Sequence, residues 1–328
     1  MSTTSMPTNL HAAPEDLADL QQCLPIELQT PTTVFTRIAA GMSEAGVYRV
    51  SAADRQFVLK ITAPDEGADS WRSKVQVQQS AADAGIAPKV FHIDENRRAV
   101  LSELIVDRSF PAQLGNPATR LAAIESLGRM LRSLHALPIP QGTKPADAMG
   151  FLNTIWNAVA QDFVLPAFVR EAVERLRVEL PPASAGALVM SHNDVNPTNL
   201  VFDGERVMLL DWQTTAPNNA YYDLATIAMF FRLDDETSCK LIAAHNDAPV
   251  DAVPDVFRYF RRFAPVMSGA AALHMARLRG HPGGEVAAEL TPSLGEVYQQ
   301  LRSGAFDIGS VDGQWTFGLA LVKEGIFS

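Results

Sequence analysis

The hydrophobic pattern of the chain changes after about residue 105. Between residues 34 and 105, apolar positions form short β-prone runs, among them Val47–Val50 and Phe57–Ile61. Ser51-Ala52-Ala53-Asp54 connects these two runs in the manner of a hairpin. This part of the sequence therefore predicts strands joined by short turns.

One helix is expected among these strands. Trp71–Ala84 has a helical pattern, and Gly85 follows it at the position where glycine commonly ends a helix. The next apolar run, Ala99–Ile105, predicts a further strand. Residues 34–105 are thus expected to form a small sheet with one helix.

Beyond Pro117 the apolar residues recur every three or four positions, which is the spacing of one helix face. They are Leu121, Ile124, Leu127, Leu131 and Leu134. Two later segments, Val164–Leu180 and Asp255–Leu278, also have helical patterns, and the strand-rich segment Leu188–Trp212 lies between them. The expected fold class is α+β, with a small sheet-rich lobe followed by a larger, mainly helical lobe.

We expect three parts along the chain. Residues 1–30 form an N-terminal extension, residues 31–105 the first lobe and residues 106–328 the second. A length of 328 residues suits two packed lobes better than one hydrophobic core.

Composition and charge exclude several classes of protein. The formal net charge of −10 disfavours nucleic acids and anionic membranes as partners. Cys23 and Cys239 are the only cysteines and have no metal-ligand spacing, so structural zinc and a disulfide framework are not expected. No stretch approaches the roughly 18 apolar residues of a membrane span, and no secretory signal pattern is present. We expect a cytoplasmic monomer or homodimer.

The segment from Ser191 to Asp211 carries the most informative chemistry. His192, Asp194 and Asn199 have the spacing HxDxxxxN, and Asp203-Gly204 then separates two apolar runs, which is a strong hairpin signal. A hairpin brings its open ends together, so Asn199 and Asp211 are expected to lie side by side.

Phosphoryl transfer from ATP requires such a set of side chains. Mg²⁺ prefers oxygen ligands and keeps several waters, so Asn199, Asp211 and phosphate oxygens suffice to hold it. A second carboxylate, Asp194, is the candidate base that orients the acceptor hydroxyl and takes its proton.

Asp223 has two interpretations. It begins a helical pattern and is consistent with an ordinary helix cap. Alternatively, it is a buried carboxylate that accepts backbone N–H groups of the catalytic loop.

Residues 188–231 resemble the catalytic segment of the choline/ethanolamine kinase and aminoglycoside phosphotransferase superfamily. The matching residues are His192, Asp194, Asn199, Asp211 and Asp223, and Asp211 is followed by Trp212. The resemblance implies a protein-kinase-like fold, ATP, Mg²⁺ and a small-molecule hydroxyl acceptor. It also implies that His192 supports the loop and is not the base.

The first lobe has candidate nucleotide contacts. Gly41 and Ser43 lie in a turn between two strand candidates, where glycines and N–H groups can approach phosphates. Lys60 resembles the phosphate-binding lysine of the family. By the same resemblance, Glu103 and Ile105 lie in the hinge that binds the adenine edge.

One feature departs from the kinase pattern, in which this lysine pairs with a glutamate on the following helix. Residues 70–82 contain no acidic side chain. A nearby glutamine replaces the glutamate, or Asp69 or Asp83 reaches Lys60, or the pair is absent.

The acceptor is the least determined part of the prediction. Trp212, Gln213 and Tyr222 are candidate contacts, and aromatic faces would suit an amino alcohol such as choline. An acidic cluster at residues 234–236 would suit an aminoglycoside-like polyamine. The arginines of residues 258–279 would suit an anionic acceptor, or they form a solvated face.

Three functions remain open from the sequence. The first is an ATP-dependent small-molecule kinase with an alcohol acceptor. The second is a pseudokinase that binds nucleotide as a regulatory module, because Lys60 lacks its glutamate. The third is a metal-dependent hydrolase using Asp194 and Asp211, which the scarcity of further ligand-spaced residues disfavours.

Overall fold

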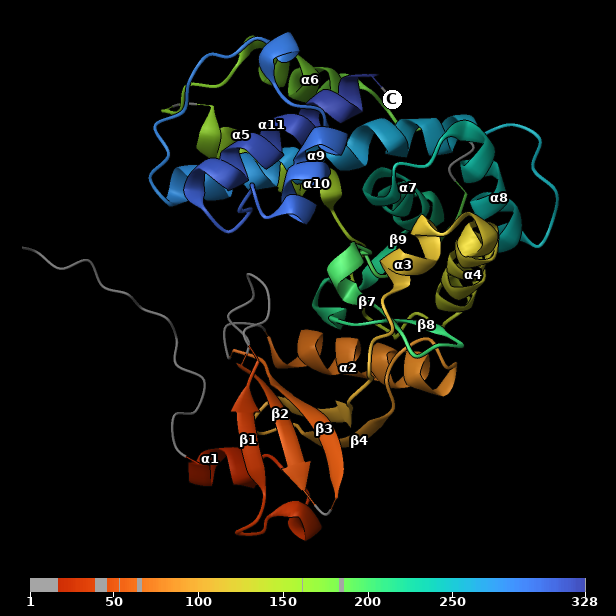
Figure 1. Cartoon of the computed structure of the whole chain (residues 1–328), viewed down its shortest axis with the longest axis vertical. Helices are drawn as coiled ribbons and strands as arrows, with labels where there is room; N and C mark the ends of the chain where they lie inside the picture. Colours follow the sequence, from red (N-terminus) through yellow and green to blue (C-terminus); the bar gives the residue numbers. More distant parts are fainter. Residues whose placement is uncertain are drawn as a thin grey trace, which may run out of the picture. The chain divides into compact units, whose positions relative to one another are not determined.

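A computed structural model describes residues 17–38, 46–52, 54–63, 67–160, 162–182 and 186–327 (Figure 1). The chain forms two compact units, and the first contains three segments separated along the sequence. The first unit consists of residues up to Gln113, Leu137–Thr143 and Thr198–Thr215, and the second of Leu114–Ala136, Lys144–Pro197 and Ala216–Ser328. The expected α+β composition, with a small sheet and a mainly helical remainder, is confirmed.

The first unit is built on a five-stranded antiparallel sheet in the order β1-β2-β3-β5-β4. Its elements are α1 (Leu17–Gln22), η1 (Ile26–Leu28), β1 (Val34–Arg37), β2 (Gly46–Ala52), β3 (Arg55–Ile61), α2 (Ala68–Asp83), β4 (Val90–Asp94) and β5 (Ala99–Glu103). The predicted hairpin is present, but its strands are longer than expected. Ser51 pairs with Gln56, so it belongs to β2 and not to the connection.

The two faces of this sheet bury different sets of side chains. Leu20 of α1 packs in one cluster with Phe57 and Leu59 of β3. Side chains alternate along a strand, so Lys60 points to the other face. Its partner on β5, Val100, packs there against Trp71 of α2. Lys60 is therefore held on the face of the sheet that α2 covers.

A short hairpin completes the first unit. It consists of η2 (Pro197–Asn199), β7 (Leu200–Phe202), β8 (Val207–Leu209) and η3 (Trp212–Thr214), and β7 pairs with β8 antiparallel, as predicted. The Leu209 N–H donates to the Ile86 carbonyl at 2.8 Å, which joins the hairpin to the chain after α2. This contact explains why the hairpin belongs with the sheet although it follows it by some hundred residues.

The second unit is mainly helical. Its helices are α4 (Pro117–His135), α5 (Ala148–Val159), α6 (Ala167–Val178), α7 (Ala220–Phe231), α8 (Asp235–Asn246), α9 (Asp255–Leu278), η4 (Ala288–Leu290), α10 (Leu294–Ser303) and α11 (Val311–Phe327), and α3 (Phe110–Gly115) precedes them. The predicted helix over Val164–Leu180 begins only at Ala167, because Pro166 stands at its N-cap. β6 (Leu188–Ser191) pairs antiparallel with β9 (Ala216–Asn219).

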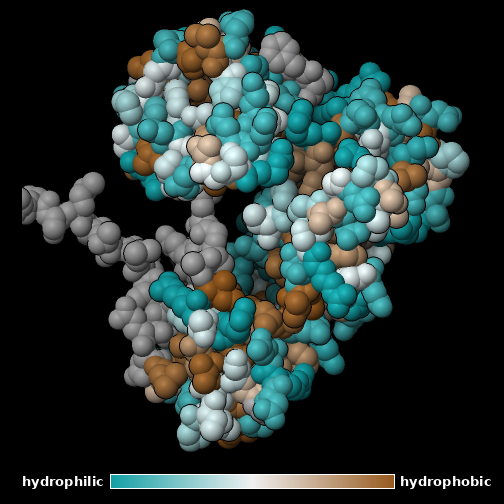
Figure 2. Space-filling view, in the orientation of Figure 1, coloured by the Kyte–Doolittle hydropathy of each residue, from teal (hydrophilic) through white to brown (hydrophobic). Residues whose placement is uncertain are grey.

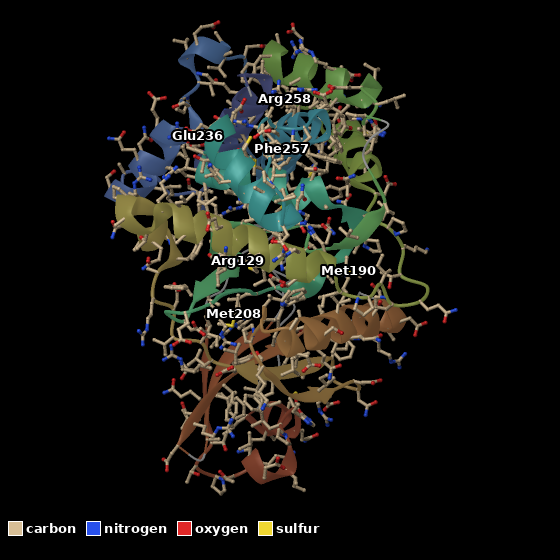
Figure 3. All side chains as sticks on the ribbon, turned by 90° about the vertical axis from the view of Figure 1, so that its right-hand side faces the viewer. Arg129, Met190, Met208, Glu236, Phe257 and Arg258 are labelled. Carbon is tan, nitrogen blue, oxygen red and sulfur yellow. The ribbon has the colours of Figure 1, made fainter. Side chains whose placement is uncertain are left out.

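Helix packing in this unit depends on small residues and a long apolar stripe. α9 and α11 cross closely at Gly269, where an added Cβ would lie 2.7 Å from the Gly318 carbonyl oxygen. Phe257 of α9 and Met190 of β6 are fully buried (Figure 3). The helices at the top of Figure 2 present mainly hydrophilic side chains to solvent. In the described part of the chain, no helix combines the length and hydrophobicity that crossing a membrane requires.

Candidate active site

The loop after β6 is fixed by Asp223, the fourth residue of α7. This carboxylate is fully buried, and its Oδ2 accepts the Ser191 hydroxyl at 2.7 Å and the His192 N–H at 2.9 Å. Its Oδ1 accepts the Asn193 N–H at 2.9 Å. The side chain that caps α7 is Asn219 and not Asp223. Of the two interpretations of Asp223, the geometry favours the carboxylate that holds the loop.

Asn193 is a loop residue whose importance the sequence did not reveal. Its φ is +65°, a left-handed conformation that asparagine adopts more readily than most residues. Its side-chain amide donates to the Ala216 carbonyl at 3.1 Å and accepts from Asn218 at 2.7 Å. An asparagine between His192 and Asp194 was the available signal, because few other residues tolerate this backbone conformation.

Asp194 directly follows this fixed residue. Its side chain is half-buried, and Oδ1 accepts the side-chain amide of Asn196 at 2.9 Å. Val195, the residue between them, is fully buried. The loop therefore orients Asp194 from both sides, with the Asp223 anchor before it and the Asn196 amide after it. His192 is fully buried.

Two histidines extend the anchor of the loop. His135, at the end of α4, lies with Nε2 3.2 Å from Asp223 Oδ2. His135 Nδ1 lies 2.8 Å from Nε2 of His245 on α8. Burial raises the pKa of Asp223, but the hydrogen bond and charge of His135, together with His192 and Ser191, outweigh it and hold that pKa below its ordinary value. Asp223 is therefore ionised at neutral pH.

The hairpin in the first unit places Asn199 and Asp211 at its open end, as predicted. The Leu210 N–H donates to the Asn199 carbonyl at 2.8 Å. Asn199 is buried, whereas the Asp211 side chain is 33% exposed. Asp211 also has a positive φ of +60°, a strained conformation of the kind that clusters at functional sites.

The partner of Lys60 is a correction to the sequence-based alternatives. Lys60 Nζ forms an ion pair with Asp211 Oδ1 at 2.7 Å. Asp69 does not reach it, because its carboxylate is fully exposed and pairs with Arg72. The lysine is thus paired with a carboxylate 151 residues away in the sequence, and not with a side chain of the following helix.

A small cavity of about 50 Å³ adjoins this ion pair. Its lining includes Lys60, Asp211, Gln213 and, from α2, Lys74 and Gln78. The structure places one predicted acceptor residue, Gln213, in the wall of a cavity beside the ion pair.

The other predicted acceptor contacts are buried. Trp212 is 4% exposed, and its indole N–H donates to the Leu209 carbonyl at 3.3 Å. Tyr222 is also 4% exposed and packs edge-on against Phe260. Burial raises the pKa of the Tyr222 phenol, with a further contribution from Asp223.

Of the four remaining predicted nucleotide contacts, the structure describes only two, Glu103 and Ile105. Gly41 and Ser43 lie outside the described residues. Glu103 ends β5, and its N–H donates to the Lys89 carbonyl at 2.8 Å. Ile105 follows two residues later and is half-buried.

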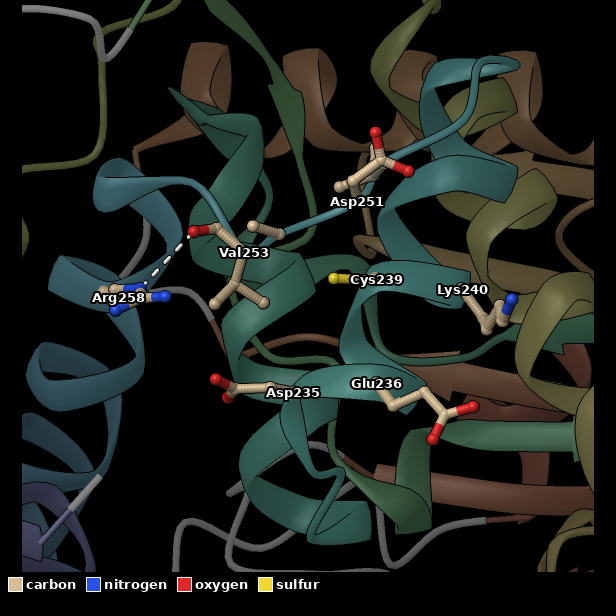
Figure 4. A pocket seen from close by; sticks show the side chains of 9 residues that line it. Asp235, Glu236, Cys239, Lys240, Asp251, Val253 and Arg258 are labelled. Atoms are coloured by element: carbon tan, nitrogen blue, oxygen red, sulfur yellow. Dashed lines mark hydrogen bonds between the residues drawn. The ribbon is translucent and has the colours of Figure 1, made fainter.

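A larger cavity, of about 470 Å³, lies between α8 and the start of α9 (Figure 4). Cys239, Asp251 and Arg258 are among its lining residues, and the Arg258 guanidinium donates to the Val253 carbonyl at 3.3 Å. None of the predicted catalytic, metal or nucleotide residues lines it, but Asp235 and Glu236 of the acidic cluster do, together with Arg258.

Two neighbouring arginines of α9 are held by acidic partners in the same unit. Arg261 pairs with Asp235 at 2.5 Å and Arg262 pairs with Glu179. These ion pairs neutralise two of the arginines of residues 258–279, so those two do not require an anionic acceptor as a partner.

Asn199 and Asp211 suit a hard cation. In the described residues, no group of three or more His, Cys, Asp and Glu side chains is arranged to hold a metal ion. Mg²⁺ does not require one, because it binds through one or two protein oxygens together with phosphate oxygens and water. The amide and carboxylate oxygens at the hairpin end are donors of this type.

Comparison with solved structures reveals the same fold in several kinases of small molecules. A choline/ethanolamine kinase family protein from Mesorhizobium loti is 16% identical, with 93% of this chain and 97% of that chain covered and a TM-score of 0.60. The choline kinase LicA from Streptococcus pneumoniae is 15% identical, with 76% and 88% covered and a TM-score of 0.57. A further LicA structure, in complex with AMP, is 14% identical over 88% and 94% with the same TM-score.

An aminoglycoside-3'-phosphotransferase of type VIII is 21% identical, with 73% of this chain and 95% of that chain covered and a TM-score of 0.53. No curated protein sequence matches the chain. The model of the phosphotransferase enzyme family matches residues 34–260, which include the sheet, the loop after β6 and the hairpin. The chain therefore belongs to the phosphotransferase enzyme family.

Proposed function

We propose that the protein transfers the γ-phosphoryl group of ATP, with Mg²⁺, to a hydroxyl of a small acceptor. The observation that carries this proposal is the loop before Asp194, which a fully buried carboxylate holds by two backbone N–H groups and one hydroxyl. Such a fixed loop is what a positioned base requires.

Asp194 is the proposed base. It orients the acceptor hydroxyl and accepts its proton as the oxygen attacks phosphorus. The side-chain amide of Asn196 donates to one oxygen of the Asp194 carboxylate, which restrains the orientation of the proposed base.

Asn199 and Asp211 are the proposed Mg²⁺ ligands. When bound, the ion would neutralise charge on the phosphate oxygens. Lys60 contributes a second positive charge close to Asp211, from which it can donate to phosphate oxygens.

The nucleotide contacts follow from position. The LicA structure that holds AMP supports nucleotide binding by this fold. We assign the adenine edge to the backbone around Glu103 and Ile105, and the phosphates to Lys60, Gly41 and Ser43.

An amino alcohol or an aminoglycoside-like compound is the proposed acceptor. The relatives with this fold include choline kinases and an aminoglycoside phosphotransferase. Gln213 is the proposed acceptor contact, because it lines the cavity beside Lys60 and Asp211.

A pseudokinase is the second candidate. The observation that favours it is the cavity wall, where α2 contributes Lys74 and Gln78 and no acidic side chain. A pseudokinase would bind nucleotide without turnover.

The decisive experiment is ADP release by the purified protein with Mg²⁺-ATP and a panel of alcohols. The panel includes choline, ethanolamine, amino sugars, aminoglycosides and macrolides. Acceptor-dependent release is expected, and Asp194→Asn should reduce it by about 10³-fold, within the range for loss of a general base. Nucleotide affinity, measured by calorimetry, should be unchanged.

Asp69→Asn is the matched control, because it makes the same chemical change at a fully exposed side chain. It should retain full turnover. ATP binding without turnover on any acceptor would favour the pseudokinase, and absence of ATP binding would contradict both candidates.

A further inference from the structure

Four side chains of the second unit form a continuous chain of polar contacts. Asn246, the last residue of α8, presents Oδ1 to His245 Nδ1 at 2.8 Å. His245 Nε2 meets His135 Nδ1 at 2.8 Å, and His135 Nε2 meets Asp223 Oδ2 at 3.2 Å. The chain runs from the exposed end of α8 to the buried carboxylate that holds the loop.

A glycine allows the two histidines to meet. A Cβ added at Gly128 of α4 would lie 2.5 Å from the Leu241 carbonyl oxygen and 3.0 Å from the His245 nitrogen. Only a residue without a side chain permits α8 to approach α4 this closely. The close packing fixes the distance between the two helices and therefore between the two rings.

The number of protons in this series of four side chains follows from the groups at its two ends. With the Asn246 oxygen directed at His245, both ends of the series are acceptors, so each end requires an N–H from the ring beside it. The contact between His135 and His245 requires a third N–H. Two neutral imidazoles carry only two N–H groups, so the arrangement contains one extra proton. A second extra proton is excluded, because two N–H groups would then face each other between the rings.

The charged groups around the pair are consistent with a single positive charge next to Asp223. From α7 the pair meets Asp223, and the loop after β6 adds His192, which also acts on that carboxylate. From α4 it meets Arg132, which pairs with Asp247 beyond α8 at 2.8 Å. Burial lowers the pKa of His245, and the charges of His135 and Arg132 lower it further, although the hydrogen bond with Asn246 and the charge of Asp223 act in the opposite direction. Of the two rings, His135 is the one in contact with the carboxylate.

We propose that His135 and His245 share one extra proton and act as positioning residues for the catalytic loop. The positive charge compensates the buried Asp223 carboxylate, which holds the backbone of His192 and Asn193 directly before Asp194. The expected effect on turnover rests on the proposed role of Asp194. The number of protons on the two histidines does not depend on that role.

The sign of the pH effect follows from the charge. As pH rises through the titration of the pair, the proton leaves and the Asn246 amide must turn to donate to His245. Asp223 then lacks its charged partner while its oxygens still hold the loop. The hold on the loop weakens, so kcat is expected to fall on the alkaline side.

The first experiment counts the proton by ¹⁵N NMR of the histidine rings. His245→Gln assigns the pair among the seven histidines of the chain. One proton is expected to leave the pair in a single step that involves both rings. Independent titration of the two rings, or two neutral rings from pH 5 to 9, would overturn the proposal.

The second experiment changes Asn246, the acceptor at the exposed end of the four-residue series. Asn246→Asp keeps the acceptor and adds a negative charge, so the titration of the pair should move up by about one pH unit. Asn246→Leu removes the acceptor and should move it down. Asn96→Asp, an exposed asparagine in the first unit, is the matched control and should leave the titration unchanged.

Amide hydrogen exchange reports the loop without relying on turnover. Protection of the His192 and Asn193 amides should fall over the same pH range in which the pair titrates, and both should shift together in Asn246→Asp. Where turnover is measurable, the alkaline limb of kcat should shift by the same amount. Protection that does not follow the titration would overturn the positioning role, even in a protein with no identified acceptor.

Discussion

Asp223 and Asp211 are two carboxylates of one short segment that the fold uses in opposite ways. Asp223, in the second unit, is fully buried and accepts hydrogen bonds from two backbone N–H groups and the Ser191 hydroxyl. Asp211, in the first unit, is 33% exposed and pairs with Lys60. The first is surrounded by donors that fix the chain, whereas the second lies beside a cavity that two lysines, Lys60 and Lys74, help to line.

This difference distinguishes a carboxylate that stabilises structure from one that is available to a ligand. A buried ion that loses its partners is strongly destabilising, so Asp223 is bound to its surroundings. A half-exposed ion pair contributes little to stability and can exchange its partner. Asp211 can therefore bind a cation without unfolding its surroundings.

The largest expected effect is on turnover and concerns Asp211. Asp211→Asn should reduce turnover by about 10³-fold, equivalent to about 4 kcal/mol in the activation barrier, because the proposed Mg²⁺ ligand loses its charge. The urea midpoint should hardly change. ADP release and urea unfolding measure the two quantities, and turnover that survives the substitution would contradict the assignment of Asp211 as a metal ligand.

The next effect is on stability and concerns Asp223. Asp223→Asn places an NH₂ group among hydrogen-bond donors in a buried site and should lower the free energy of unfolding by about 3 kcal/mol. Urea unfolding at pH 7 measures it. A loss below about 1 kcal/mol would show that the loop does not depend on the ionised carboxylate.

The same variant has a defined pH dependence. The pKa of Asp223 is depressed in the folded state, so its stabilising contribution is present above the ordinary aspartate pKa of about 4 and is lost as pH falls through the folded value. The stability difference between the parent and Asp223→Asn should therefore shrink below about pH 4.

The smallest expected effect is on stability and concerns Asn193, in the loop that Asp223 holds. Asn193→Gly removes the side-chain hydrogen bonds but permits the φ of +65°, whereas Asn193→Ala removes them and adds backbone strain. The alanine variant should be less stable than the glycine variant by about 1 kcal/mol in urea unfolding. Equal stabilities would indicate that the loop changes its conformation when the side chain is lost.

Local patterns sufficed to predict much of the fold and part of the site. The hairpin around Asp203-Gly204 was predicted from a turn dipeptide between two apolar runs, and it brings Asn199 and Asp211 to one end. α2 and α9 were predicted within a few residues of their bounds. These features depend on backbone preferences and on the spacing of apolar residues over short distances, which the sequence displays directly.

Contacts between distant residues were not predictable in this way. No pattern near Lys60 identifies Asp211 as its partner, because the two residues meet only when the hairpin packs beside the sheet. The same holds for His135, which lies 88 residues before Asp223, and for His245 on another helix. Trp212 and Tyr222 were proposed as acceptor contacts from residue type, but their burial depends on which helices pack over them.

The sequence alone established the types of chemical group in residues 191–211 and their order, because a strand, a tight turn and a second strand leave few arrangements for this segment. Which charges meet was settled by the packing of distant segments. The energy of a charge depends on its burial and on the donors around it, and both come from segments far away in the chain. For this reason Asp211 and Asp223, twelve residues apart, have such different surroundings.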